Sequence, residues 1–211
     1  MGKKLELELV KPGQKGNTLS LSLKKQTGVV VELRWESRED LDGHMLLATN
    51  DGNRGRVYTL SRVLSTYNTK LPLADGSSKR RICGDTRSFK TPCGSLVHSG
   101  DARSGGLKSD ADEIITVNFP LIPDDVNEIP IFITIDSERP ITFSQVQNAS
   151  IRILDDGGDT MGEYHLTRQF GEFNAVQMGS LVRTEDNGWE YVPAGSGFMG
   201  DFNTILEHFS G

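Results

Sequence analysis

The sequence lacks the features that mark membrane, secreted and nucleic-acid-binding proteins. No apolar run in its 211 residues approaches the roughly 18 residues that a membrane span needs. The first residues turn polar at once, unlike a secretory signal. A net charge of −6 leaves the chain without the basic surface that nucleic-acid phosphates require. We therefore expect a cytoplasmic protein that neither inserts into a membrane nor binds nucleic acid.

Sequence signatures of catalysis are missing as well. The chain has no His-Glu-x-x-His motif and no Gly-x-Ser-x-Gly motif. Its Gly-rich segment 195–202 lacks the Lys-Ser/Thr pair of a phosphate-binding loop. We expect a protein that acts without catalysing a reaction. The histidines are scattered along the chain, at His44, His98, His165 and His208.

Cysteine is scarce, with only Cys83 and Cys93, both in a polar, basic segment. Two thiols without a helping histidine or a second cysteine pair make a weak zinc site. A disulfide between them is sterically possible. In a reducing cytosol we expect both thiols to be free.

Alternating and β-branched segments are abundant, and they predict strands. Residues 155–159 and 186–188 are typical of hairpin turns. Apolar residues spaced i, i+3, i+4 and i+7 predict an amphipathic helix over 200–209, and shorter helices are expected at 123–129 and 142–149. The predicted strands are 4–10, 18–23, 28–35, 44–49, 114–119, 129–135, 149–154, 162–166, 175–183 and 189–192.

These elements predict an all-β fold, a β-sandwich of about ten strands with a few short helices and a C-terminal amphipathic helix. We expect residues 1–211 to form one such domain. Residues 65–97 are basic, rich in Gly and Ser and poor in pattern, and we interpret them as a long excursion from the sandwich. Because a loop of that length usually has a function, we expect it to contact an unidentified protein partner.

Negative charge is concentrated between residues 98 and 114. Asp101, Asp110, Asp112 and Glu113 lie there among Gly, Ser and Ala residues, immediately before a predicted strand. Calcium favours six to eight oxygen ligands supplied by carboxylates and backbone carbonyls on flexible loops. The segment is therefore either a calcium site or a solvated acidic loop.

A second acidic segment, residues 39–43, contains Asp40 and Asp42 and follows the predicted strand that ends at Trp35. Two acidic loops at one end of a sandwich are able to share a cation. The spacing of residues 98–114 does not match an EF-hand, because Arg103 stands where that loop needs an oxygen ligand.

Taken in order, the motifs resemble those of the tellurium-resistance TerD family over residues 19–211. The first two are "VVVELRWESREDLDGHMLL" and "HSGDARSGGLKSDADEIITVNF". They are followed by "LIPDDVNEIPIFITI", "FSQVQNASIRILD", "EYHL", "MGSLVRTEDNGWEYVPAGSGF" and "ILEHFSG".

The resemblance implies a calcium-binding β-sandwich that acts by binding in tellurite, phage and chemical stress responses. Carried over by position, it implies a metal site with side-chain ligands from both acidic segments and carbonyl ligands from the segment 98–114. The implied carbonyl donors are Gly100, Arg103 and Gly105. The implied side-chain ligands are Asp40, Asp42, Asp101, Asp110, Asp112 and Glu113.

Two departures from the family pattern bear on this site. The acidic box here is Asp110-Ala111-Asp112, where the family usually has adjacent carboxylates, and Lys108 brings a positive charge near it. One of two calcium positions is therefore expected to be weakened or lost. The long segment 65–97 fits a divergent, phage-encoded member. The alternative function is a structural or assembly protein, such as a virion component, that uses the same calcium-stabilised sandwich.

Overall fold

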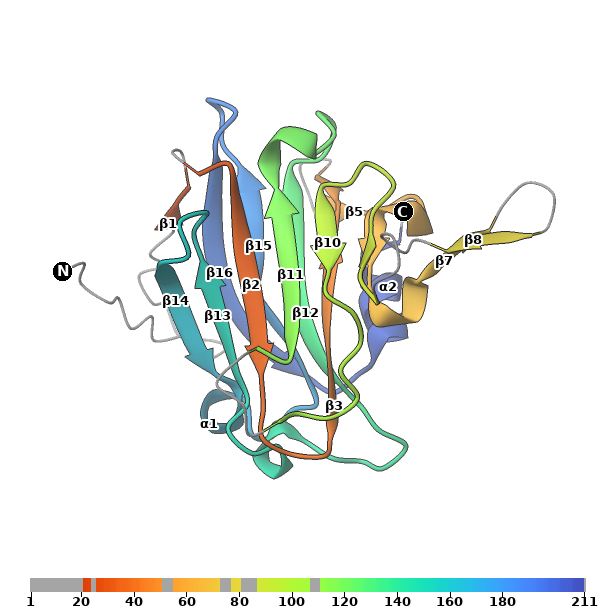
Figure 1. The fold of residues 1–211 in the computed structure, drawn as a ribbon, viewed down its shortest axis with the longest axis vertical. Helices are drawn as coiled ribbons and strands as arrows, with labels where there is room; N and C mark the ends of the chain where they lie inside the picture. The colour runs from red at the N-terminus through yellow and green to blue at the C-terminus, as the bar shows by residue number, and fades with distance from the viewer. Residues whose placement is uncertain are drawn as a thin grey trace.

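Two six-stranded antiparallel sheets form the two layers of the protein (Figure 1). The structure is a computed structural model, and it describes residues 21–23, 26–50, 55–72, 77–80, 87–106 and 111–210.

The first sheet has the strand order β1-β16-β15-β12-β3-β6, and all its pairs are antiparallel. The hairpin of β15 and β16 turns at Asn187, which adopts the positive φ of 60° that such a turn requires. The strands are β1 (Leu21–Ser22), β3 (Asp40–Leu46), β6 (Val63–Leu64), β12 (Glu128–Asp136), β15 (Ala175–Arg183) and β16 (Trp189–Phe198).

The second sheet has the order β14-β13-β2-β11-β10-β9, with β2 at its centre (Figure 1). The turn between β13 and β14 is held by Asp155, whose side chain accepts hydrogen bonds from the amides of Gly157 and Asp159. The strands are β2 (Gly28–Arg34), β9 (Phe89–Lys90), β10 (Leu96–His98), β11 (Glu113–Asn118), β13 (Ser150–Leu154) and β14 (Thr160–His165).

The remaining elements are short. No helix in the described ranges has the length and hydropathy needed to cross a membrane. Two small ribbons pair β4 (Thr49–Asn50) with β5 (Gly55–Arg56) and β7 (Lys70–Pro72) with β8 (Ser78–Arg80). The helices are α1 (Leu166–Gln169), α2 (Phe202–Phe209) and the 3₁₀ turns η1 (Leu60–Arg62), η2 (Thr66–Asn68), η3 (Phe119–Leu121) and η4 (Phe143–Gln145).

Alternation along the strands builds the core between the sheets. Val29, Val31 and Leu33 of β2 are buried, while the residues between them are partly exposed. A smaller apolar cluster, which includes Phe132, lies under α2. Asp201 caps that helix by accepting a hydrogen bond from the amide of Thr204 at 2.9 Å.

The predicted β-sandwich and C-terminal helix are confirmed. The predicted helix at 123–129 is wrong, because that segment forms a turn leading into β12, and 142–149 contributes only the turn η4. The segment 39–43 was expected to be a loop, but Asp40 and Asp42 lie on β3, four residues earlier than the predicted strand start. The predicted strand 4–10 and the thiol of Cys83 lie outside the described residues, and Cys93 is a free, exposed thiol.

The end of segment 65–97 belongs to the sandwich. β9 pairs with β10 at the edge of the second sheet, and Phe89 of β9 is only 2% exposed. Its ring stacks on His98 with centroids 4.7 Å apart. The ribbon of β7 and β8 instead extends away from the two sheets (Figure 1).

We expect Phe89→Ala to lower the free energy of unfolding by about 3 kcal/mol, because it empties a buried aromatic position. Urea denaturation measures this change. The control Tyr58→Ala removes a ring that is 62% exposed and is expected to change stability by less than about 0.5 kcal/mol. Equal effects of the two variants would contradict the placement of β9 in the core.

Candidate metal centre

Three aspartates from the two sheets meet at one edge of the sandwich. Asp40 and Asp42 lie on β3 of the first sheet, and Asp101 lies in the loop that follows β10 of the second sheet. One oxygen from each carboxylate lies within 4.8 Å of the others. Residues of the acidic segment 39–43 and of the start of segment 98–114 therefore form one cluster, as the sequence predicted.

The pairing of β3 places these aspartates at an edge of the first sheet. β6 pairs only with Met45 and Leu46, so the first half of β3 has a neighbour on one side only. Alternation places Asp40 and Asp42 on one face of the strand, and Leu41 on the opposite, core-facing side.

Glu113 joins the two sheets beneath this cluster. It is 1% exposed, and its carboxylate accepts hydrogen bonds from the amides of Gly43 on β3 at 3.1 Å and Ala102 at 3.2 Å. The Nε2 atom of buried His98 lies 3.3 Å from the same carboxylate without making a hydrogen bond. Because Gly43 adjoins Asp42 and Ala102 adjoins Asp101, Glu113 fixes the backbone next to two of the three aspartates.

Residues of η2 also orient Asp42 through hydrogen bonds. Its two oxygens accept hydrogen bonds from the hydroxyls of Thr66 at 2.5 Å and Tyr67 at 2.9 Å. The Tyr67 ring stacks on Phe202 at the start of α2, with centroids 5.5 Å apart. Asp42 is therefore oriented by its neighbours and is only 3% exposed.

Burial and mutual repulsion make Asp40 and Asp42 costly to ionise. Burial, followed by the charges of Asp42 and Asp101, raises the pKa of Asp40 from 3.8 to about 7. Burial also raises the pKa of Asp42 to about 6, although the hydrogen bond from Thr66 opposes the shift. A bound cation would convert this repulsion into attraction.

The available oxygens fit a hard divalent cation. The Oδ1 atoms of Asp40 and Asp101 are buried and have no hydrogen-bond partner in the described part of the chain. Buried polar atoms are nearly always paired, so these two oxygens point to a missing ligand. Three carboxylates supply the oxygen-only donor set that calcium prefers, and Asp40, Asp42 and Asp101 are the side chains that could hold it.

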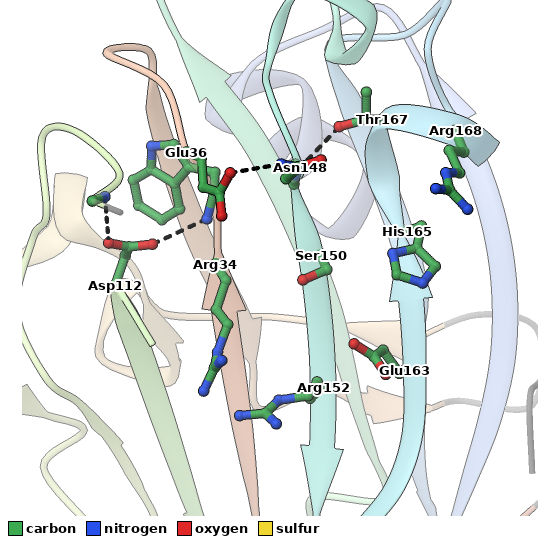
Figure 2. A pocket seen from close by; sticks show the side chains of 13 residues that line it. Arg34, Glu36, Asp112, Asn148, Ser150, Arg152, Glu163, His165, Thr167 and Arg168 are labelled. Atoms are coloured by element: carbon green, nitrogen blue, oxygen red, sulfur yellow. Dashed lines mark hydrogen bonds between the residues drawn. The ribbon is translucent and has the colours of Figure 1, made fainter. Parts of the chain in front are cut away.

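The other residues implied by the resemblance lie in different surroundings. The carboxylate of Asp112 is turned to the outer face of the second sheet, where it accepts hydrogen bonds from the amides of Trp35 and Gly106, both at 3.0 Å (Figure 2). Asp110 lies outside the described residues. The carbonyl ligands expected from Gly100, Arg103 and Gly105 stay predictions.

Sequence reasoning missed three residues around the cluster. Thr66 and Tyr67 orient Asp42, but nothing in the segment that contains them signals an aspartate partner. Asp136 pairs with Asp40 across β12 and β3, and its charge further raises the pKa of Asp40. The contact between Asp136 and Asp40 could be predicted only if the register between β12 and β3 were known.

Comparison with known proteins gives a family match. The model of the TerD domain matches residues 87–209, a span that contains Asp101 but not Asp40 or Asp42. The chain is 34% identical over 114 residues to tellurium resistance protein TerZ of Serratia marcescens, covering 54% of this chain and 56% of that protein. It is 36% identical over 119 residues to general stress protein 16U of Bacillus subtilis (strain 168), covering 55% and 61% respectively. The chain therefore spans little more than half the length of these curated relatives.

Solved structures share the fold. A homologue of telluride resistance protein (TerD) from Streptomyces coelicolor A3(2) superimposes with a TM-score of 0.64 at 18% identity, covering 86% of this chain and 95% of that one. A crystal structure of a protein of unknown function gives a TM-score of 0.65 at 16% identity, covering 87% and 96%. The shared β-sandwich extends beyond the matched family span.

We expect Asp40→Asn to stabilise the metal-free protein at pH 8, by about 1–2 kcal/mol once partial solvent exposure is allowed for. The folded-state pKa of Asp40 is raised, so its ionisation lowers stability as pH rises from about 4 through about 7. The asparagine cannot ionise, so its advantage should disappear by about pH 4.

Thermal unfolding in chelator across this pH range measures the effect. Asp159→Asn, in the exposed turn between β13 and β14, is the matched control and should show no such pH-dependent gain. A gain that is independent of pH would contradict the assignment of the repulsion to Asp40.

Proposed function

Because this chain belongs to the TerD family of tellurium-resistance and stress proteins, we propose that it is a calcium-binding adaptor that acts by binding rather than catalysis. The observation that carries the proposal is the convergence of Asp40, Asp42 and Asp101, two of whose buried oxygens have no hydrogen-bond partner in the part of the chain that the structure describes. Calcium would supply the positive charge that these carboxylates need in order to stay ionised together.

The geometry favours calcium over magnesium. Magnesium demands near-ideal octahedral coordination and gives up its water reluctantly, whereas calcium accepts irregular sets of carboxylates and carbonyls. The donors here come from a strand and a loop on different sheets, and Asp42 already accepts two hydrogen bonds. An irregular donor set of this kind suits the larger ion.

A role in stress or tellurium resistance rests on the relatives, which are named for those properties. As an adaptor, the protein would need a macromolecular partner, and we place the contact on segment 65–97. Its β7–β8 ribbon extends from the sandwich, where it is accessible to another molecule (Figure 1).

We expect calcium to raise the melting temperature, because an ion that binds only the folded state stabilises it by about 2.7 kcal/mol at a hundredfold excess over Kd. Magnesium should have a much smaller effect. Asp42→Asn and Asp101→Asn should each remove most of the calcium effect, since each takes one negative charge from the cluster. Calorimetric titration measures the calcium affinity of each variant, and thermal unfolding measures the shift in its melting temperature.

Two further variants sharpen this test. Asp159→Asn lies in a remote turn and should leave calcium binding unchanged. Asp112→Asn should weaken calcium binding less than Asp101→Asn, because Asp112 faces backbone amides at the outer face. If Asp42→Asn leaves the calcium affinity untouched, the two acidic segments do not share an ion.

Shortening the β7–β8 ribbon between Lys70 and Arg80 should abolish partner binding while calcium binding is retained. Co-purification from cells, compared in calcium and in chelator, measures the interaction. Undiminished co-purification with the shortened chain would place the partner contact elsewhere.

A further inference from the structure

A polar cavity of about 390 Å³ lies on the outer face of the second sheet, on the strands β2, β13 and β14 (Figure 2). Its shape follows from the register of these strands. Ser150 is the direct neighbour of Arg34 on one side and His165 on the other. A small residue between two long side chains leaves a hollow, and Ser150 forms part of its floor (Figure 2).

Two residues that line this cavity, Arg34 and Arg152, each carry a buried hydrogen-bond donor without an acceptor in the described ranges. The Nε atoms of Arg34 and Arg152 are buried and have no partner within the described ranges. Both guanidinium groups instead contact one carboxylate, that of Glu32, through their Nη2 atoms. Two cations thus contact the same carboxylate, and their two buried Nε–H groups have no acceptor in the described part of the chain, which is rare in native proteins.

The acidic groups that line the cavity are largely occupied. Asp112 accepts hydrogen bonds from two backbone amides, and Glu36 accepts one from the side chain of Asn148 at 2.6 Å (Figure 2). Glu163 is the cross-strand neighbour of Arg152 and is the one further acid among the lining residues. His165 and Arg168 add two more donor groups to the wall (Figure 2).

From this excess of donors, we propose that the cavity binds a small phosphate-bearing molecule. A phosphate group offers three or more strong acceptor oxygens, and guanidinium groups match it with paired, charge-assisted hydrogen bonds. Arg34, Arg152, Ser150, His165 and Arg168 supply the donors. The volume lies within the range of small-molecule sites, so part of an organic substituent would also be enclosed.

This site is distinct from the metal centre. The cavity lies on the outer face of the second sheet, whereas the aspartate cluster lies at the β3 edge. None of the three clustered aspartates lines the cavity. Phosphate binding should therefore persist in chelator. A failure to observe phosphate binding would leave the proposed calcium function unaffected.

The test is titration of the full chain with inorganic phosphate in chelator, at constant pH and ionic strength. The Nε–H resonances of Arg34 and Arg152 in a ¹H–¹⁵N spectrum report on the two unsatisfied donors. We expect both to shift and to saturate in the millimolar range or below. Acetate, which has only two oxygens, should bind several-fold more weakly.

Ser150→Leu fills the floor without changing charge and should abolish the saturable shift. Thr116→Leu is the matched control, because Thr116 is an exposed position on the neighbouring strand β11 and does not line the cavity. His165→Gln, at an exposed position that should not affect folding, is expected to weaken binding several-fold. The absence of a saturable shift in the unsubstituted chain would overturn the proposal, as would equal binding by Ser150→Leu and Thr116→Leu.

Discussion

The geometry of the aspartate cluster depends on the hydrogen bonds that the buried carboxylate of Glu113 accepts. This carboxylate accepts amide hydrogen bonds from Gly43 on one sheet and Ala102 in a loop of the other. A buried carboxylate is expensive unless its oxygens are paired, so these bonds are costly to break. Each donor adjoins an aspartate of the cluster, and Glu113 thereby holds Asp42 and Asp101 in place without itself belonging to the three clustered side chains.

The same arrangement explains why the carboxylates of Asp40, Asp42 and Asp101 stay close together in the folded protein although they repel one another. A flexible acidic loop would separate its charges in water, but Asp40 and Asp42 are fixed by strand geometry and Asp101 by the loop attached to Glu113. Tyr67 and Thr66 further restrict Asp42 by hydrogen bonding. The fold thus holds like charges close together, and two of their oxygens have no hydrogen-bond partner among the described residues, an arrangement that could hold a metal ion.

Much of the fold was predictable because alternation is a local property. The segments of β2, β13 and β15 show it clearly, and the structure places strands there. The joining of Asp40 and Asp42 with Asp101 was predicted from two acidic segments. Thr66 and Tyr67 were missed because their contact with Asp42 depends on how η2 packs, which no short pattern encodes. The helix expected at 123–129 failed because its apolar residues enter the core through a turn and the start of β12.

The acidic box shows what strand geometry adds to composition. Asp112 and Glu113 are adjacent at the start of β11, and neighbouring side chains on an extended chain point to opposite faces. Glu113 accordingly points inward to the amides beneath the aspartate cluster, and Asp112 points outward to Trp35 and Gly106. The family resemblance assigns both to one metal site, whereas alternation separates them. Adjacent residues of one short acidic motif thus contribute to two separate places. Glu113 holds the backbone beside the aspartate cluster at the sandwich edge, and Asp112 lines the polar cavity on the outer face.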